Sequence, residues 1–343
     1  MSGFDIHEIG DSWAERYGAL CAATPSHLIY ATWSFRSFLR DTLGCRPSYL
    51  GAIDQAGNLV AALPLMSQEG RFGRVVNSLP FFGSNGGLIG ADPAARATLW
   101  SAYVGIARAP GTAAATVIFA PGESVDLPVA PDFADRRIGQ ITDLGLARSS
   151  EALFAAIDGS SRRNVRKAES SGVEVVIDND AFPALQDIHR ENMAAIGGRE
   201  KPTRFFELLP RHFRAGVEYN IYVARLGGEI VAALLLFYAG RTVDYYIPAT
   251  RLSARAAQPS AAILFRAMRD AADAGYTAWN WGGTWVTQDG VLRFKRKWAA
   301  HDVPYDYHVL LNNRELLTQT PKTLLNEYPF FYVLPFDALS AKF

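Results

Sequence analysis

The sequence predicts an α/β protein built from two similar units, and three observations support that fold class. The chain has 343 residues, whereas one domain usually takes roughly 150. Hydrophobic residues make up 49% of it and charged residues 20%, which is typical of a globular protein with a sizeable core. Each half shows helical patterns, a strand meander, a further helix and a strand, in that order. We therefore expect two domains, at residues 1–148 and 149–343.

The first half carries a meander of short strands followed by a helix. Runs of β-branched and apolar residues predict the strands. These runs are 49–54, 59–67 and 74–82. A glycine-rich loop at Gly83–Gly87 ends the meander, and Asp92-Pro93 predicts the start of an alanine-rich helix that reaches about Ala109. A strand at 114–121 completes this half.

The second half repeats the plan after a seam. Residues 121–135 are rich in Pro and Asp without a clear period, and the seam extends to about Ser150. Helical patterns and a second meander follow. The helices are expected at 150–171 and 181–195, and the strands at 219–226, 229–239 and 242–249. A helix begins at Pro259 and ends before Gly275, and a short strand follows at 277–281.

Charge and composition exclude several classes of protein. Lys and Arg number 34, Asp and Glu also 34, so a general nucleic-acid coat, and DNA as a partner, are not expected. No apolar run reaches the roughly 18 residues that a membrane span needs. The amino end lacks the basic and apolar blocks of a secretory signal, so we expect a cytoplasmic protein. Cys21 and Cys45 have no partners at metal-ligand spacing, and we expect no metal site.

A first basic cluster lies in the stretch SSRRNVRKAESSGVEV, residues 160–175. Ser160 or Ser161 can cap a helix there and Gly172 can end it. The cations would then lie near the positive end of the helix, a costly place unless water or a bound anion compensates. They are Arg162, Arg163, Arg166 and Lys167. Two interpretations stay open: a solvated face, or a clamp for a phosphate or carboxylate.

A second basic cluster, VLRFKRKW, follows the phrase WNWGGT. Phe294 and Trp298 share a helical face with Val291, so the cations around Lys295 would surround a helix that docks through aromatic residues. The strand before it ends in Gly282-Gly283-Thr284, whose backbone can leave N–H groups for a ligand. Core packing with solvated charge is the alternative interpretation.

These phrases resemble the Fem-type (FemAB-like) transferases of the GNAT acyltransferase superfamily. The resemblance rests on RRNVRKAESSGVEV, on TVDYYIPA, on the helix at Pro259 and on WNWGGT before RFKRKW. In the first half, LPLM and FGRVVNSLPFFGSNGGL are similar to the amino-terminal repeat of the same family. The resemblance covers nearly the whole chain, and it implies two tandem GNAT-like domains with a substrate cleft between them.

The resemblance also implies an activity and its substrates. The best-known members move an aminoacyl group from charged tRNA to an amine on a nucleotide- or lipid-linked cell-wall precursor. The donor, acyl-coenzyme A or aminoacyl-tRNA, would be a substrate and no cofactor would be tightly bound. The acceptor would be an anionic small molecule or a lipid-linked precursor. Peripheral contact with the inner face of the membrane stays open.

Site residues follow from the matching positions. The resemblance implies that the segment Arg162–Lys167 contacts an anionic part of a substrate. It also implies that Phe294 and Lys295 lie where the acyl end or the phosphate of the donor arrives, beside Trp281, Gly283 and Thr284. Lys295 is our candidate for stabilising the oxyanion or the donor phosphate.

One loop departs from the pattern of ordinary GNAT enzymes, which hold the pyrophosphate of coenzyme A with a glycine-rich turn. The matching loop here, RLSARAAQPSA, contains no glycine, so the backbone approaches phosphate less easily. Arg251, Arg255 and the helix start at Pro259 are the groups that remain to hold a phosphate.

Acyl transfer to an amine asks for orientation more than for a strong base, because an α-amine with a pKa near 8 is partly neutral at physiological pH. Asp244 and Tyr246 alternate along a strand and share a face, where they would hold or deprotonate the amine. A plain hydrogen bond on the sheet is the alternative for this pair.

Three functions therefore compete. The first, which we favour, is an N-acyl or aminoacyl transferase acting on an amine of a peptidoglycan, polysaccharide or lipid precursor. The second is an acyl-coenzyme A-dependent N-acyltransferase on an amino sugar or lipid amine. The third is a non-catalytic protein that binds a nucleotide-linked sugar or an RNA end, because a fold does not fix a function.

Overall fold

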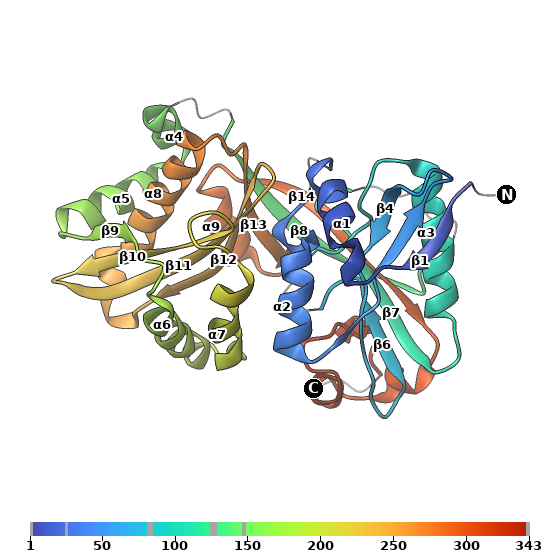
Figure 1. Cartoon of the computed structure of the whole chain (residues 1–343). Coiled ribbons are helices and arrows are strands. Elements are labelled where there is room, and N and C mark those ends of the chain that lie inside the picture. The colour runs from blue at the N-terminus through green and yellow to red at the C-terminus, as the bar shows by residue number, and fades with distance from the viewer. Residues whose placement is uncertain (1–2, 25–26, 81–84, 124–128, 146–148, 341–343) are drawn as a thin grey trace. The chain divides into compact units, whose positions relative to one another are not determined.

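The computed structural model describes residues 3–24, 27–80, 85–123, 129–145 and 149–340 (Figure 1). The chain divides into two compact units. The first comprises Met1–Ile138 and Pro304–Phe343, and the second comprises Gly139–Val303. The sequence predicts one domain over all of 149–343, whereas the segment from Pro304 onward packs with the first unit. Strand β14 causes this difference, because it pairs with β7 from nearly 200 residues away and no local pattern reveals that pairing.

The first unit contains two groups of paired strands. The strands β1 (Asp5–Glu8), β3 (Leu50–Ile53) and β4 (Leu59–Leu63) form a small antiparallel sheet. The remaining strands follow the order β2 (Arg46–Pro47), β5 (Met66–Gln68), β6 (Arg74–Asn77), β7 (Thr112–Ile118) and β14 (His301–Leu311). Only β6 and β7 are parallel among these neighbours, because the helix α3 (Pro93–Ala107) connects them as a crossover.

The helices of the first unit begin where the sequence supplies caps. The Asp92 carboxylate accepts the N–H groups of Ala94 and Ala95 at the start of α3. The others are α1 (Ala14–Ala22), α2 (Trp33–Leu43) and α10 (Pro321–Glu327). Trp100 and Tyr103 of α3 are fully buried against Leu50, Leu63 and Val117.

The expected strand 59–67 is wrong as a single element. It breaks at Pro64 into β4 and β5, which belong to different groups of strands. Proline has no N–H to donate to a ladder, so it favours a break here. The loop at Gly83–Gly87 falls partly outside the described residues, as do 124–128 and 146–148 of the expected seam.

The second unit has a sheet in the order β8 (Phe133–Asp143), β13 (Ala278–Trp285), β12 (Thr242–Thr250), β11 (Glu229–Ala239), β10 (Tyr219–Leu226) and β9 (Glu174–Ile177). The meander β10 to β12 is confirmed as antiparallel. Strand β8 lies where the sequence predicted an irregular seam. Its exposed and buried residues follow no simple alternation, so its period was hard to read.

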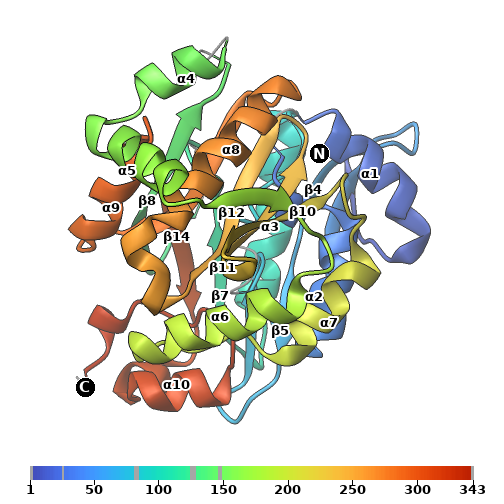
Figure 2. The same cartoon turned by 90° about the vertical axis from the view of Figure 1, so that its left-hand side faces the viewer.

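Helices cover both faces of this sheet (Figures 1 and 2). On one face, α5 (Gly159–Ser170) and α8 (Pro259–Asp273) lie side by side. On the other lie α6 (Phe182–Ala195) and α7 (Thr203–His212). Two short helices complete the unit, α4 (Ser150–Ala156) and α9 (Asp289–Arg296). The expected helix 150–171 is therefore two helices, separated at Ile157 and Asp158.

The main core of the second unit lies between the sheet and α8. Leu234, Leu236 and Val243 of the sheet pack against Leu264 and Met268 of α8. In the described part of the chain, no helix has the length and apolar character needed to cross a bilayer.

Candidate functional site

The parallel strands β12 and β13 separate shortly after they meet. They pair at three positions, from Thr242 with Ala278 to Asp244 with Asn280. Beyond that point β12 continues to Thr250 and β13 to Trp285. The register between β11 and β12 also shifts opposite Tyr246, which indicates a β-bulge. We call the point where β12 and β13 diverge the strand fork. Diverging strands leave backbone donors and acceptors that a ligand can use.

A line of buried polar contacts starts at the strand fork and ends at α9. Asn280 Nδ2 donates to Asp244 Oδ1 at 2.7 Å, and Asn280 Oδ1 accepts the N–H of Gly282 at 2.9 Å. Lys295 Nζ donates to the Gly282 carbonyl at 3.2 Å and to Thr284 Oγ1 at 2.7 Å. We call this set the polar chain. It connects β12, β13 and α9 through side chains that water hardly reaches.

Lys295 is the charged end of the polar chain. The residue is 5% exposed, and burial lowers the pKa of its ammonium to about 8. An ammonium has three N–H donors, and its contacts among the described residues occupy two of them. The third is left for an incoming acceptor atom, such as a carbonyl oxygen that gains negative charge.

Gly282 gives the polar chain its shape. Its φ is +71°, a conformation that glycine adopts without strain and other residues adopt rarely. This backbone turn lets the carbonyl of Gly282 accept from Lys295 while its N–H donates to Asn280. Gly283 beside it is exposed and Thr284 is buried.

Asp244 and Tyr246 lie on the face of the sheet that α6 and α7 cover. Phe237 is the register partner of Asp244, and the ring of Tyr246 packs edge-on against Phe237 at 4.9 Å between centroids. Burial first, and then the charge of Asp244, raise the pKa of Tyr246 above its ordinary value. Tyr246 is thus a neutral phenol at physiological pH and is unsuited to act as a base.

Lys201 is a residue that no pattern in the sequence predicts as part of a site. Its Nζ lies 5.1 Å from the ring centroids of both Phe205 and Tyr246, and burial lowers the pKa of its amine to about 7. Its backbone N–H donates to His189 Nε2 at 3.3 Å. Burial, and then the charge of Lys201, lower the pKa of His189 to about 4. Asn280 was also missed, although an Asn in the apolar strand phrase AWNW was a usable signal.

The aromatic candidates divide between the core and the surface. Trp281 is buried, and its Nε1 donates to Thr142 Oγ1 at 2.9 Å. Phe294 is 41% exposed and contacts Trp281 edge-on at 6.1 Å between centroids. Phe294 is thus the aromatic side chain of this pair that a ligand can reach, whereas Trp281 supports it from below.

The first basic cluster does not converge on one point. Arg162 Nη1 donates to the carbonyls of Ala155 and Ile157, at 2.9 and 2.7 Å, and so satisfies the carboxyl end of α4. The guanidinium of Arg166 lies 5.2 Å from the ring centroid of Phe154. Arg163 and Lys167 are exposed.

The expected cap of this helix, Ser160 or Ser161, is wrong. Asp158 caps α5, because its carboxylate accepts the N–H of Ser160 at 2.8 Å. A carboxylate therefore already occupies the helix start where a substrate anion was expected. The exposed Arg163, Arg166 and Lys167 remain accessible to a substrate.

The family model of the acetyltransferase (GNAT) domain matches residues 159–296, which lie wholly within the second unit. The second unit therefore contains a GNAT domain. The protein is an acyltransferase, and this domain contains the strand fork and the whole polar chain. GNAT domains take acyl-coenzyme A as a substrate and do not keep it as a resident cofactor.

Solved structures show that the rest of the fold is Fem-like. FemX matches with a TM-score of 0.69 at 13% identity, over 91% of this chain and 98% of that one. The C-terminal domain of a putative lysylphosphatidylglycerol synthetase from Agrobacterium fabrum matches with a TM-score of 0.58 at 16% identity, over 92% and 96%. A tandem GNAT protein from the clavulanic acid biosynthesis pathway gives 0.54 at 11%, over 90% and 98%.

These likenesses confirm the predicted fold class, two tandem GNAT-like domains. At such identities they establish the fold and leave the substrates open. No functionally curated protein matches the chain by sequence.

Ion pairs connect the glycine-free loop of this GNAT domain to the helix α6. Arg251 Nη1 contacts Glu191 Oε2 at 2.9 Å, and its other terminal nitrogen contacts Asp187. The N–H of Leu252 donates to Glu191 Oε1 at 2.7 Å. Arg251 is thus engaged by two carboxylates of α6. Arg255 is exposed in the short 3₁₀ turn Leu252–Ala257 and remains the accessible cation beside the start of α8.

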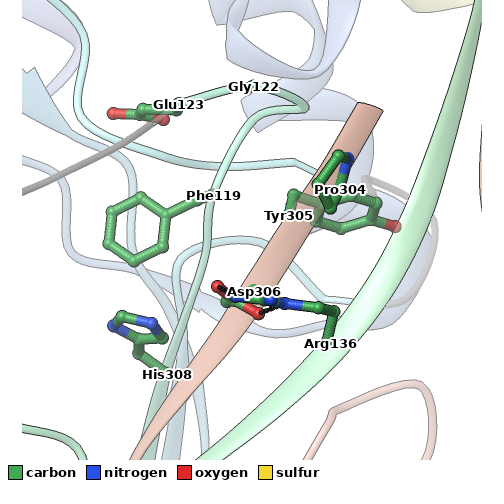
Figure 3. A pocket seen from close by; sticks show the side chains of 8 residues that line it. All are labelled: Phe119, Gly122, Glu123, Arg136, Pro304, Tyr305, Asp306 and His308. Carbon is green, nitrogen blue, oxygen red and sulfur yellow. Dashed lines mark hydrogen bonds and ion pairs between the residues drawn. The ribbon is translucent and has the colours of Figure 1, made fainter. Parts of the chain in front are cut away.

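The first unit has a cavity of about 390 Å³ (Figure 3). The ion pair between Arg136 and Asp306 crosses its wall, with nitrogen to oxygen distances of 2.9 and 3.0 Å. None of the residues expected at the acyl-transfer site lines it. Its lining residues are Phe119, Gly122, Glu123, Arg136, Pro304, Tyr305, Asp306 and His308. In the described part of the chain, no three His, Cys, Asp or Glu side chains group as metal ligands would.

Proposed function

We propose that this protein transfers an acyl or aminoacyl group to an amine of a cell-envelope precursor, with the reaction at the strand fork. The observation that carries the proposal is the buried Lys295, fixed by Gly282 and Thr284 with one N–H donor to spare. A buried ammonium held by neutral acceptors is costly to keep charged. Such a group is expected where negative charge develops during a reaction.

The reaction itself needs no redox partner. The lone pair of the acceptor amine attacks the carbonyl carbon of the donor thioester or ester, and the carbonyl oxygen becomes an oxyanion. Lys295 donates a hydrogen bond to that oxygen. The intermediate then expels the thiolate of coenzyme A or the ribose alkoxide of the tRNA, and this leaving group takes up a proton as the amine nitrogen loses one. An amide bond has replaced the thioester or ester.

The polar chain supports this role by holding Lys295 in place. Asp244 fixes Asn280, Asn280 fixes the turn at Gly282, and the Gly282 carbonyl fixes the ammonium. Asp244 is therefore proposed as a positioning residue. Tyr246 and Phe294 would line the path of the substrates, together with the exposed Gly283.

The class of acceptor is supported by the fold. The relatives of similar fold include FemX and a putative lysylphosphatidylglycerol synthetase, and the second name specifies a lipid that carries an aminoacyl group. A peptidoglycan, polysaccharide or lipid amine is accordingly the acceptor we propose. Charged tRNA is the donor we propose. Arg251 is already paired with two carboxylates and the loop has no glycine, so both are poorly suited to hold the pyrophosphate of coenzyme A.

Acyl-coenzyme A is the second candidate donor. The match to an acetyltransferase domain favours it, and the exposed Arg255 beside the start of α8 is a cation that a pyrophosphate would contact. A thermal-shift series distinguishes the two candidate donors. It tests acetyl- and long-chain acyl-coenzyme A, UDP-linked amino sugars and charged tRNA. A raised midpoint with one class of compound identifies preferential binding to the folded protein.

The test of the site is the variant Lys295→Met, which keeps a long buried side chain and removes the donor. With the donor that the thermal-shift series identifies, we expect kcat for acyl transfer to fall about 10²- to 10³-fold, the loss typical of removing one oxyanion donor. Lys322→Met, an exposed lysine of α10, is the control and should keep full activity. Unchanged turnover in Lys295→Met, with a normal melting temperature, would show that the reaction occurs elsewhere.

A further inference from the structure

The exposed hydrophobic side chains of this protein are concentrated in one short segment. Ten large hydrophobic side chains of the described residues are strongly exposed, and four of them lie within ten consecutive residues. These four are Trp285 (44% exposed), Val286 (51%), Val291 (42%) and Phe294 (41%). Single exposed hydrophobic residues are ordinary, whereas a cluster of this kind marks a surface that meets something apolar.

The segment comprises the end of β13, a tight turn and the helix α9 (Figure 1). The N–H of Gln288 donates to the carbonyl of Trp285 at 2.9 Å, which holds the turn before the helix. On α9 the buried side chains are Leu292 and Lys295. At about 100° per residue, Val291 and Phe294 are neighbours on the exposed side of the same helix.

Cations lie beside the exposed hydrophobic side chains. Arg293 and Lys297 are four residues apart and exposed, so they form a stripe next to Phe294. Arg296 is also exposed but contacts Asp302, with Nε 3.2 Å from Oδ1. Lys295 is buried and Arg296 is paired, so Arg293 and Lys297 are the exposed cations within 285–297, against the one acidic residue Asp289. The segment thus combines apolar side chains with a positive charge, although the whole chain is neutral.

We propose that the segment Trp285–Lys297 is a docking surface for an anionic lipid membrane. Short amphipathic segments with Trp or Phe on one side and Lys or Arg beside them bind at the interface of such membranes. A stable protein interface buries about 800 Å² on each partner, and four partly exposed side chains on one short helix are too few for that. Insertion into the headgroup region needs only a few such side chains.

The docking surface deepens the proposed function. Phe294, exposed on the surface, adjoins the buried Lys295 in the same helix, so a docked membrane would present the amine of a lipid or lipid-linked acceptor close to the ammonium. This consequence rests on the proposed function. Membrane binding itself does not.

The test is cosedimentation of the full chain with vesicles. We expect binding to vesicles of phosphatidylglycerol and phosphatidylcholine in equal parts, weaker binding to phosphatidylcholine alone, and a loss of binding as salt is raised. No binding to the anionic vesicles at low salt would overturn the proposal, and would leave a protein partner as the remaining occupant of the segment.

Two variants locate the surface. Trp285→Ser with Val286→Ser removes exposed apolar contacts and should weaken partitioning about tenfold or more. Arg293→Gln with Lys297→Gln should weaken it roughly fivefold for each cation and keeps the test informative if the first variant folds poorly. Val176→Ser with Ile177→Ser, an equally exposed pair on the edge strand β9, is the matched control and should bind as the wild type does. Unchanged binding in both test variants would contradict the proposal.

Activity measurements separate this inference from the proposed function. Lys295→Met should bind vesicles normally while losing transfer. If the wild type binds anionic vesicles through this segment but transfers no acyl group to any amine offered, the proposed function fails and the docking surface stands. If it transfers an acyl group to a water-soluble amine but binds no vesicles, the docking surface fails alone.

Discussion

The ammonium group of Lys295 has a pKa close to physiological pH. Burial lowers its pKa to about 8, against an ordinary value near 10.4 in model peptides. The protonated form donates to an oxyanion, and the neutral form has one donor fewer. The acceptor amine has the opposite requirement, because only its neutral form attacks. Protonation of these two groups should therefore decide the pH range of the reaction.

We expect kcat/KM to rise with pH while the acceptor amine deprotonates and to fall above about pH 8 as Lys295 loses its proton. In Lys295→Arg the cation stays charged throughout, so the alkaline fall should disappear even if the maximal rate is lower. The measurement is a pH profile of both proteins between about pH 6 and pH 10. An alkaline limb that persists unchanged in the Arg variant would assign it to another group.

Burial of Lys295 also affects the stability of the fold. The folded-state pKa lies below the unfolded one, so between about pH 8 and about pH 10.4 the unfolded chain binds more protons. The contribution of this group to the free energy of unfolding therefore rises with pH across that window. Replacing Lys295 by Met removes the contribution, which urea unfolding at both ends of the window would measure.

At the scale of elements, the strand fork depends on one side chain that connects two strands. Asn280 donates to Asp244 across the last paired position and accepts from Gly282 on its own strand. Asp244 is 1% exposed, and a buried carboxylate that loses a donor carries a desolvation cost.

Asn280→Ala should lower the free energy of unfolding by about 1 to 3 kcal/mol and should also reduce kcat, because the turn at Gly282 that holds Lys295 loosens. Urea unfolding and a transfer assay at saturating substrate are the two measurements. Asn77→Ala, a fully buried Asn of β6 in the first unit that bonds the backbone of Tyr332, controls for a general loss of stability. If Asn280→Ala lowers stability but leaves kcat unchanged, the polar chain does not position Lys295.

The helix α5 gives a second element-scale prediction. Because Arg162 satisfies two carbonyls at the end of α4, Arg162→Ala should cost about 1.5 to 3 kcal/mol of stability, as charge-assisted hydrogen bonds usually do. Arg163→Ala, exposed in the same turn, should cost less than about 0.5 kcal/mol. Thermal and urea unfolding of the Arg162→Ala and Arg163→Ala variants measure this difference in stability. Equal effects on stability would mean that the capping contacts contribute little.

Elements with a clear local period were predicted well from the sequence. The strands of the second meander and the helix α8 match within one or two residues, because alternation, turn glycines and a starting proline all indicate the same boundaries. Strands β8 and β14 were missed or misplaced, since their partners lie far away in the sequence. Lys295 and Thr284 could be named as candidates from their phrase, but the contacts through Asn280 and Gly282 depend on where β12 and β13 separate.

At the scale of the whole molecule, the two units differ in how the chain builds them. The second is one continuous stretch, whereas the first needs residues from both ends of the chain. The last segment supplies β14, which pairs with β7 from Tyr307 to Leu311. It also supplies Tyr332, whose backbone N–H and carbonyl both bond the side chain of Asn77.

A chain shortened to end at Val303 should therefore keep the second unit and lose the first. We expect limited proteolysis to digest residues before Ile138 quickly and to leave a resistant fragment near Gly139–Val303, because β7 loses its pairing partner and its buried neighbours. The full chain digested under the same conditions is the control. Equal resistance of both units in the shortened chain would show that the first unit folds without its last segment.

The discontinuity of the first unit sets an order of events during synthesis. Domains fold as units while the ribosome adds about 5 to 20 residues per second. The residues up to Ile138 lack the strand that completes their sheet until the paired part of β14, within the segment 304–343 of the same unit, has been made. The second unit is complete in sequence before then. The part of the protein that contains the polar chain can therefore reach its native structure first, while the older amino-terminal part of the chain waits with the edge of β7 unpaired and exposed to chaperones or to misassembly.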